Sequence, residues 1–320
     1  MVSQVFTISL MSSKFVHLHL HTEYSLLDGM SQISNLVTHI KSNDMDTVSL
    51  TDHGVMYGAV EFYKKCKKAE VKPIIGMESY TTNVPLTERP KRGGFKNFHL
   101  LLLAKDKVGY KNLMKLSSIA NIKGYYYRPR VTREILAKHS KGLICSSACP
   151  ASELSNAFIE GNYSEAKKIA QWFLDVFGDD YYLEVMRHNI EEHAKHAEDP
   201  NIRDELTKQA SIQKTINNGV VKLSRDLGIP IIATNDAHYI KKEDANAQDT
   251  LVCIATGKEV SETKRLRFID APEFYVKTPN EMKDLFSDLP EAIENTLKVA
   301  EKCNLEIEIG KWFFPKVKLP

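Results

Sequence analysis

Seven short runs rich in β-branched, leucine and aromatic residues recur along the chain, with helical stretches between them. The runs are FVHLHL (15–20), TVSLTD (47–52), KPIIGMESY (72–80), FHLLLLA (98–104), GLICSS (142–147), YYLEVM (181–186) and IPIIATND (229–236). Between the first three runs, apolar residues follow the three- and four-residue spacing of amphipathic helices. Strands that alternate with helices predict an α/β fold with a parallel sheet, either open and doubly wound or closed into a barrel. No nucleotide-binding glycine motif follows any run, so we favour the barrel.

The composition sets limits on function. The chain has 320 residues and 42% hydrophobic content, enough to bury a full core. Its formal net charge of +2 is too small for bulk attraction to nucleic acid, so any phosphate contact must come from a local site. Five cysteines without regular spacing argue against a disulfide framework and for a reducing cytoplasm. Residues 1–13 lack the pattern of a signal peptide or a membrane span, and we expect them to form an N-terminal extension.

The first run and the residue after it place three histidines, His17, His19 and His21, at alternate positions between apolar residues. Alternation is the period of a β-strand, so the imidazoles share one face. A single histidine there would ordinarily be a solvated side chain. Three in succession favour a metal site, because neutral imidazole is the commonest metal ligand and two of them can reach one ion.

Further potential ligands follow other runs. In parallel α/β barrels, the loops at the carboxyl ends of the strands build the active site. The side chains placed there are Asp28, Asp52, His53, Glu78, Cys149, Asp236 and His238. His99 does not fit this rule, because it opens its run instead of closing it.

Each of these residues has an ordinary alternative role when taken singly. Asp28 could belong only to a turn with Gly29, and Asp52 could cap the helix that follows it. Glu78 could be an exposed strand residue, and Cys149 a small core residue. Because so many ligand types gather at the ends of predicted strands, we favour a metal site.

One other histidine pair lies in a long polar helical insertion, residues 191–219. His193 and His196 are one helical turn apart and could imitate a metal pair. The stretch is so highly charged that we interpret both as solvated surface residues.

Several stretches carry a resemblance to a known family. They are HLHLHTEYSLLDG, SLTDHG, VEFYKKCKKAEVKPIIGMESY, HLLLLAKDKVGYKNLMKL, ATNDAHY and DAPEFYVKTPNEM. They closely resemble the polymerase-and-histidinol-phosphatase (PHP) domain, in the form found at the amino terminus of bacterial DNA polymerase III alpha subunits. The resemblance runs from about Lys14 to the end of the chain. It implies a distorted seven-stranded (β/α) barrel with a trinuclear metal site at the carboxyl ends of the strands, which agrees with the strand count.

The resemblance also implies a division of the chain. Residues 1–13 would be the extension, 14–280 the PHP metal-dependent phosphoesterase domain, and 281–320 a helix and extended segment leading toward a polymerase palm. The parent chain would be a nucleotidyltransferase. We expect its polymerase active site to lie outside this sequence, because no pair of neighbouring aspartates on adjacent strands follows Met282.

The ligand set carried over from the family holds two to three divalent ions, with zinc, manganese and iron all compatible. His19, His21, Glu78 and Asp236 would hold one ion, Glu78, His99 and Cys149 a second, and Asp28, His53 and His238 a third. Glu78 and Asp236 would hold the metal-activated water. Phosphatase members usually carry histidines where this chain has Asp28 and Cys149, so these two residues favour the polymerase branch. His17 would pack or support the ligands, and Arg130 and His188 are candidate substrate contacts.

The implied reaction is phosphodiester hydrolysis, with 3′–5′ exonuclease proofreading of DNA as the leading hypothesis. The expected partners are a single-stranded or mispaired DNA 3′ end, the remainder of the alpha subunit and a separate proofreading subunit, in the cytoplasm and away from membranes. The alternative is a non-catalytic, metal-stabilised scaffold that supports the polymerase and docks a separate exonuclease. A stand-alone histidinol-phosphate phosphatase is disfavoured by the polymerase-type tail.

Overall fold

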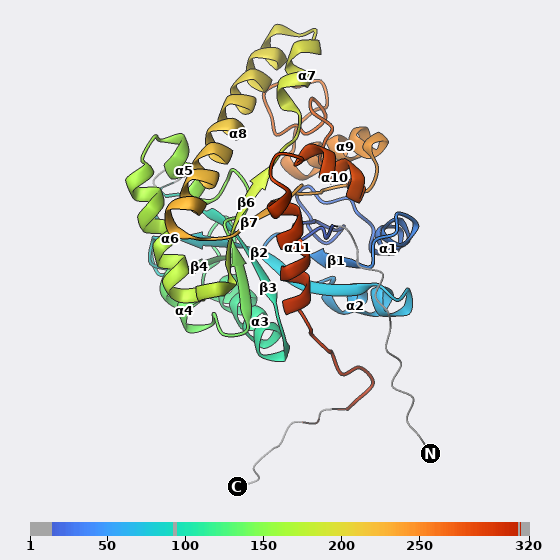
Figure 1. Cartoon of the computed structure of the whole chain (residues 1–320), viewed down its shortest axis with the longest axis vertical. Helices are drawn as coiled ribbons and strands as arrows, with labels where there is room; N and C mark the ends of the chain where they lie inside the picture. Colours follow the sequence, from blue (N-terminus) through green and yellow to red (C-terminus); the bar gives the residue numbers. More distant parts are fainter. Residues whose placement is uncertain (1–14, 92–94, 313, 315–320) are drawn as a thin grey trace.

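The structure, a computed structural model, describes residues 15–91, 95–312 and 314 (Figure 1). The expected N-terminal extension, residues 1–13, lies outside the described residues. The strands are β1 (Thr47–Leu50), β2 (Lys72–Thr82), β3 (Phe98–Ala104), β4 (Arg130–Thr132), β5 (Leu143–Ser146), β6 (Tyr181–Met186) and β7 (Ile231–Thr234). The helices are α1 (Ile33–Ser42), α2 (Ala59–Lys68), α3 (Lys107–Ile122), α4 (Arg133–Lys138), α5 (Glu153–Ile159), α6 (Tyr163–Phe177), α7 (Ile190–His196), α8 (Pro200–Leu227), α9 (Ala245–Thr256), α10 (Pro279–Leu285) and α11 (Pro290–Lys302).

The strands form one curled, mixed sheet in the order β1-β2-β3-β5-β6-β7, with β4 beside β2. Most pairs are parallel, but β3 runs antiparallel to both β2 and β5. The prediction of a wholly parallel sheet is therefore wrong at β3. The described part of the connection between β2 and β3 contains no helix, so the chain returns as a hairpin instead of making the crossover that parallel strands require.

The first predicted strand is not a regular strand, yet it joins the two edges of the sheet. His17 bridges Val48 in β1, and Leu20 bridges Ala237 just after β7. The Ser49 N–H donates to the His17 carbonyl at 3.0 Å, and the His21 N–H donates to the Ala237 carbonyl at 2.8 Å. This segment thus lies between β1 and β7, and the result is the expected distorted α/β barrel.

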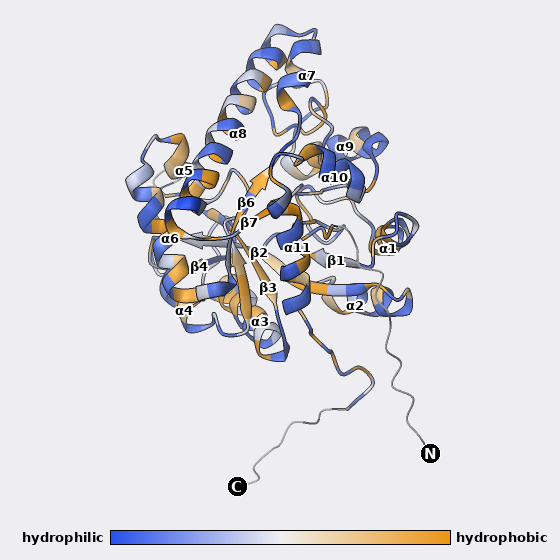
Figure 2. Ribbon diagram, in the orientation of Figure 1, coloured by the Kyte–Doolittle hydropathy of each residue, from blue (hydrophilic) through white to orange (hydrophobic). Residues whose placement is uncertain are grey.

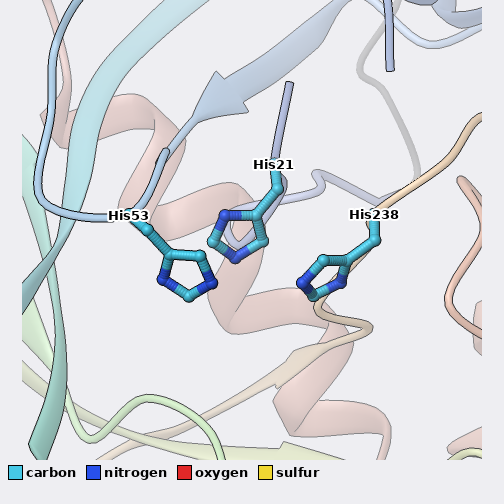
Figure 3. Close-up of side chains that lie close together, drawn as sticks. All are labelled: His21, His53 and His238. Atoms are coloured by element: carbon cyan, nitrogen blue, oxygen red, sulfur yellow. The ribbon is translucent and has the colours of Figure 1, made fainter. Parts of the chain in front are cut away.

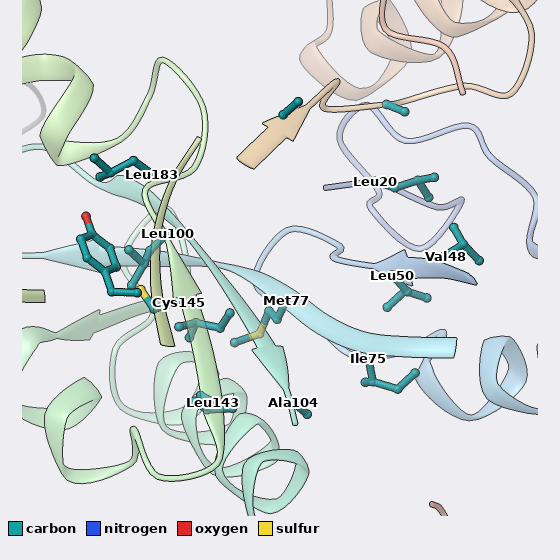
Figure 4. Packing of buried hydrophobic residues seen from close by; sticks show 14 of the residues in the cluster. Leu20, Val48, Leu50, Ile75, Met77, Leu100, Ala104, Leu143, Cys145 and Leu183 are labelled. Carbon is teal, nitrogen blue, oxygen red and sulfur yellow. The ribbon is translucent and has the colours of Figure 1, made fainter. Parts of the chain in front are cut away.

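Apolar side chains from the strands fill the interior and meet the inner faces of the helices. Figure 4 shows Leu20, Val48, Leu50 and Ile75 in this buried cluster. Hydrophobic residues gather on the strands and on the sides of the helices that face them, and hydrophilic residues face outward (Figure 2). Within the described part of the chain, no helix is both long and apolar enough to cross a membrane.

The predicted polar insertion forms α7 and α8, which project from one end of the barrel (Figure 1). The base of α8 is tied to the end of β6, because the Asn217 side-chain amide donates to the Met186 carbonyl at 2.7 Å. The helix expected after residue 280 is α11, which packs against β7. The Asn295 side-chain amide donates to the Ile231 carbonyl at 2.8 Å, and this buried hydrogen bond attaches α11 to the barrel.

Candidate metal centre

Histidine and carboxylate side chains from five parts of the fold meet at one end of the barrel. They come from the segment that closes the sheet, from the loops after β1 and β7, and from β2 and β3. The residues are His19, His21, His53, Glu78, His99, Asp236 and His238. Figure 3 shows the His21, His53 and His238 rings close together, although they are far apart in the sequence. The His21 ring stacks on His53 at 4.3 Å and on His238 at 4.5 Å between centroids.

The antiparallel direction of β3 explains why His99 belongs to this group. Tyr80, near the carboxyl end of β2, pairs with His99 at the start of β3. The amino end of an antiparallel strand lies beside the carboxyl end of its neighbour. His99 therefore reaches the same rim as the other ligands, although it opens its run in the sequence.

Glu78 lies at the middle of the cluster and is almost completely buried. Its Oε1 is 2.9 Å from His99 Nδ1 and 3.3 Å from His19 Nε2. Its Oε2 is 2.7 Å from His53 Nδ1 and 3.5 Å from His21 Nε2. One carboxylate thus faces four imidazoles, which is the arrangement a bridging ligand requires.

Two aspartates contact different histidines of the cluster. Asp236 Oδ1 is 3.2 Å from His19 Nε2 and 3.1 Å from His21 Nε2. Asp28 Oδ2 is 3.5 Å from His53 Nε2 and 3.7 Å from His238 Nε2. Asp236 has a φ of 47°, in the left-handed region, and such conformations concentrate at functional sites.

The cluster is electrostatically coupled. Burial opposes a charge on His19 and His53, but the surrounding carboxylates outweigh it and raise the pKa of both well above the usual value. Burial likewise opposes ionisation of Glu78, but the neighbouring imidazoles hold its pKa well below the usual range. Burial and the nearby His53 and His238 lower the pKa of His21 to about 3. The carboxylates are therefore ionised and need positive charge beside them.

The donor atoms fit divalent metal ions. Four of them are buried and have no hydrogen-bond partner within the described ranges: His19 Nε2, Asp28 Oδ1, His53 Nδ1 and Glu78 Oε2. The donor atoms form three groups, and within each group they all lie within 4.8 Å of one another. The groups are His21, His53 and His238; His19, His21 and Asp236; and His53, Glu78 and His99. Buried polar atoms left without hydrogen bonds are costly unless they bind something else, and imidazole and carboxylate ligands suit zinc, manganese or iron.

Cys149 lies at the edge of the cluster, with its Sγ 3.3 Å from His99 Nδ1. Burial and the Glu78 charge raise the pKa of its thiol, so a bound cation would be needed to stabilise the thiolate.

Two of the ordinary alternative roles, those of Glu78 and Asp52, are wrong. Glu78 is not exposed, and Asp52 does not cap α2, because its Oδ1 accepts from the Thr22 N–H at 2.6 Å instead.

Sequence reasoning missed Glu184, in β6. Its Oε2 lies 3.0 Å from His19 Nδ1 and accepts a hydrogen bond from Thr234 Oγ1 at 2.7 Å, while its Oε1 accepts from the Ala148 N–H at 3.1 Å. A carboxylate on the second ring nitrogen fixes the tautomer and orientation of a metal-binding histidine. An acidic residue inside the apolar run YYLEVM was the available signal, because a buried carboxylate requires partners.

The remaining predicted residues lie outside this cluster. His17 is buried, and its Nε2 lies 2.8 Å from the Lys277 carbonyl oxygen. Both nitrogens of His188 are engaged within the protein, by the Asn235 carbonyl at 3.1 Å and the Gln213 side chain at 2.8 Å. Arg130 is completely buried in β4.

The two histidines of the insertion do not form a metal pair. His196 is exposed and contacts Glu192. His193 is partly buried, with its Nε2 2.9 Å from Glu273 Oε1, so the interpretation as a fully solvated residue is wrong for His193.

Comparisons with known proteins agree with this geometry. The model of the PHP domain family matches residues 17–188. The DNA polymerase III subunit alpha of Borreliella burgdorferi is 44% identical over 293 residues, covering 91% of this chain and 24% of that protein. The corresponding subunit of Campylobacter jejuni is 44% identical over 316 residues, covering 96% of this chain and 24% of that protein. The chain therefore spans about a quarter of the length of these relatives.

Among solved structures, a two-domain protein from Bacteroides vulgatus, described as containing a predicted PHP-like metal-dependent phosphoesterase, aligns with 93% of this chain and 72% of its own. The identity is 13% and the TM-score 0.37, too low to support any conclusion. The family profile covers more than half of the chain, including most of the ligand-bearing elements. The chain belongs to the PHP domain family and is homologous to bacterial DNA polymerase III alpha subunits.

Proposed function

We propose that this chain is the PHP domain of a DNA polymerase III alpha subunit and that it hydrolyses phosphodiester bonds at the 3′ end of DNA, as a 3′–5′ proofreading exonuclease. The proposal rests first on the completeness of the ligand set. All nine expected ligand positions hold residues able to bind a metal ion: His19, His21, Asp28, His53, Glu78, His99, Cys149, Asp236 and His238. A complete set of ligands is what metal-dependent hydrolysis requires of the protein.

One observation favours catalysis over a purely structural centre: the cluster has an open side. The His19 and His21 side chains are fully buried, whereas those of His99, Asp236 and His53 are 19%, 11% and 10% exposed. Structural metal sites are closed by protein ligands, and catalytic sites keep a position for water or substrate. A DNA end could approach from this side.

The residues of the cluster would have separate roles in the reaction. Divalent ions bound here would lower the pKa of a water molecule and neutralise charge on the phosphate. Glu78 and Asp236 would supply the ionised carboxylates that hold such ions. Glu184 orients His19 through its second ring nitrogen.

We further propose that two to three zinc, manganese or iron ions bind per chain and that the domain acts in the cytoplasm with the rest of the alpha subunit, DNA and a separate proofreading subunit. Metal analysis after purification without chelator tests the stoichiometry, and less than one ion per chain contradicts it. The second candidate function is a metal-stabilised scaffold, which the deep burial of most ligands also fits. A stand-alone histidinol-phosphate phosphatase is less favoured, because the relatives are polymerase subunits.

The test compares two matched substitutions on 3′-labelled single-stranded and mispaired DNA with Mn²⁺ or Zn²⁺. Asp236→Asn removes a charged ligand at nearly constant volume, and we expect cleavage to fall by about 100-fold or more, beyond the usual effect of residues that only support a ligand. Asp44→Asn is the control. Asp44 is exposed and has a φ of 55°, so the control makes the same chemical change in the same backbone region far from the cluster.

Circular dichroism should show that both variants remain folded, and only the control should cleave as fast as wild type. If metal-loaded wild-type protein releases no nucleotide, or if Asp236→Asn retains full activity, the exonuclease proposal fails. The scaffold function would then replace it.

A further inference from the structure

The loop between α3 and β4, with the sequence GYYYRPR (124–130), presents tyrosines to solvent. The Tyr125 and Tyr127 side chains are 59% and 53% exposed. Tyr126, between them, turns inward and stacks on Phe95 at 5.3 Å between centroids. Exposure of aromatic surface to water is unfavourable. Two exposed tyrosines in one short loop therefore indicate a ligand-binding surface.

The loop is held firmly in this shape. The Tyr126 hydroxyl donates to the Pro90 carbonyl at 2.7 Å, and the Tyr126 N–H donates to the Arg128 carbonyl at 3.1 Å. A Cβ on Gly124 would lie 2.0 Å from the Arg130 carbonyl oxygen, so the loop closes too tightly for any other residue there. Tyr127 has a φ of 60°, which is strained for a bulky side chain. Such strain persists where the surrounding structure imposes it, often at ligand-binding sites.

Positive charge accompanies the rings. Arg130 is buried between Phe95 and Tyr126, 5.5 and 5.3 Å from their centroids, and its Nη1 and Nη2 have no hydrogen-bond partner in the described part of the chain. Arg89 also lies over the Tyr126 ring, 5.3 Å from its centroid. Arg128 is exposed, and within the described ranges it forms no ion pair. The exposed Arg89 and Arg128 guanidinium groups form no ion pair with a described carboxylate, which leaves their charge available to an anion, whereas the buried Arg130 supports the rings.

The loop adjoins the metal centre. Arg128 lies over the Tyr80 ring at 5.8 Å. That ring stacks on His53 at 5.8 Å and meets the edge of His99 at 5.1 Å. His53 and His99 are on the open side of the centre, so Arg128 and the Tyr80 ring connect the loop to the ligands.

We infer that Tyr125, Tyr127 and Arg128, supported by Tyr126 and Phe95, form a stacking platform for single-stranded DNA. Bases would stack on the two exposed tyrosine rings, and Arg128 would contact the phosphate next to the metal centre. Aromatic rings combined with arginines are how proteins bind single strands without reading sequence, because every base has a π-face. Duplex DNA fits poorly, since its bases are already stacked. This inference rests on the proposed function for its direction, because it names the surface that would guide a 3′ end to the cluster.

The test measures binding of fluorescein-labelled dT12 by fluorescence anisotropy in EDTA, where metal-dependent cleavage cannot occur. Base stacking on an aromatic ring is typically worth about 1–3 kcal/mol, so each of Tyr125→Ala and Tyr127→Ala should weaken binding roughly 5- to 150-fold. Tyr125→Phe and Tyr127→Phe keep the rings and should bind like wild type. Trp312→Ala is the matched control, because Trp312 is an 86% exposed aromatic residue outside the platform.

Two further variants separate binding from folding. Tyr127→Gly removes the ring but also relieves the left-handed strain, so dT12 binding should fall while the melting temperature does not. Arg128→Gln should reduce the slope of log K against log salt by about 0.7, the value for one phosphate contact on a single strand. A merely structural loop would not produce either result.

The outcomes separate this inference from the proposed exonuclease. Weaker dT12 binding in the alanine variants supports the platform even if the wild type cleaves nothing. Unchanged binding in those variants, or no dT12 binding by the wild type, overturns the platform and leaves any measured cleavage unaffected. Equal loss of binding in Trp312→Ala would also overturn it, because the effect would then follow from exposed aromatic residues in general.

Discussion

At the scale of single residues, the neighbouring charges decide which buried histidines carry charge. His17 and His19 are two positions apart and both buried, but their surroundings differ. Three carboxylates surround His19 and raise its pKa, whereas His17 faces a backbone carbonyl and the Lys277 side chain. Burial lowers the pKa of His17 to about 4, and the Lys277 charge acts in the same direction. One histidine of the alternating set is therefore a neutral packing residue, and the other belongs to the ionic cluster.

This difference predicts a pH dependence. Because the pKa of His17 is lower in the folded chain than the usual 6.5, the unfolded chain takes up this proton first as the pH falls. The free energy of unfolding should therefore decrease between pH 6.5 and 4, with His17 contributing a loss of about 2 kcal/mol between pH 7 and pH 5. Urea unfolding in EDTA at pH 7 and at pH 5 measures this loss of stability. His17→Gln should lose that much less stability than wild type over this interval, and the exposed control His196→Gln should behave like wild type. Equal pH slopes in wild type and His17→Gln would contradict the prediction.

At the scale of secondary-structure elements, close backbone contacts position the sheet. The amino end of α3 touches the turn before β5, where a Cβ on Gly109 would lie 1.9 Å from the Gly142 carbonyl oxygen. Since β5 flanks β3, this contact helps to hold the strand that carries His99.

Gly109→Ala should therefore destabilise the protein. In an exposed helix, Gly→Ala normally stabilises by about 1 kcal/mol. Here the methyl group would collide with backbone that cannot rotate away, and overpacking of this kind costs about 1–3 kcal/mol. Thermal or urea unfolding measures whether Gly109→Ala lowers or raises the stability of the protein. Ser118→Ala, on the exposed side of the same helix, is the control and should be nearly neutral. A Gly109→Ala protein as stable as wild type would show that the helix can move away.

At the scale of the whole molecule, the metal centre joins the segment that closes the sheet to β2, β3 and the end of β7. Ions bound there should stabilise the folded chain, by about 2.7 kcal/mol for a metal present at 100 times its dissociation constant. Melting temperatures with EDTA and with added Mn²⁺ or Zn²⁺ measure this effect. The His19→Ala/His21→Ala double variant should lose most of the metal-dependent increase, whereas His196→Ala should retain it. An identical increase in the double variant would place the stabilising ions elsewhere.

The class of fold and most of the ligands could be predicted from the amino-acid sequence. Local patterns carry this information: six of the seven apolar runs are strands, and ligand-type residues at strand ends mark His53, Asp236 and His238. Strand propensity and periodicity depend on neighbouring residues, so they can be read along one chain.

The direction of β3, the role of His99 and the contribution of Glu184 depend on how the chain packs in three dimensions. Strand direction depends on how the connection packs, and the Pro/Gly-rich loop before β3 has no periodicity that reveals it. His99 reaches the cluster only because β3 runs antiparallel, and Glu184 meets His19 only because the sheet places β6 next to β7, which borders the closing segment. Contacts between residues more than a hundred positions apart leave no local pattern, because they arise from the closure of the sheet and not from the order of the residues.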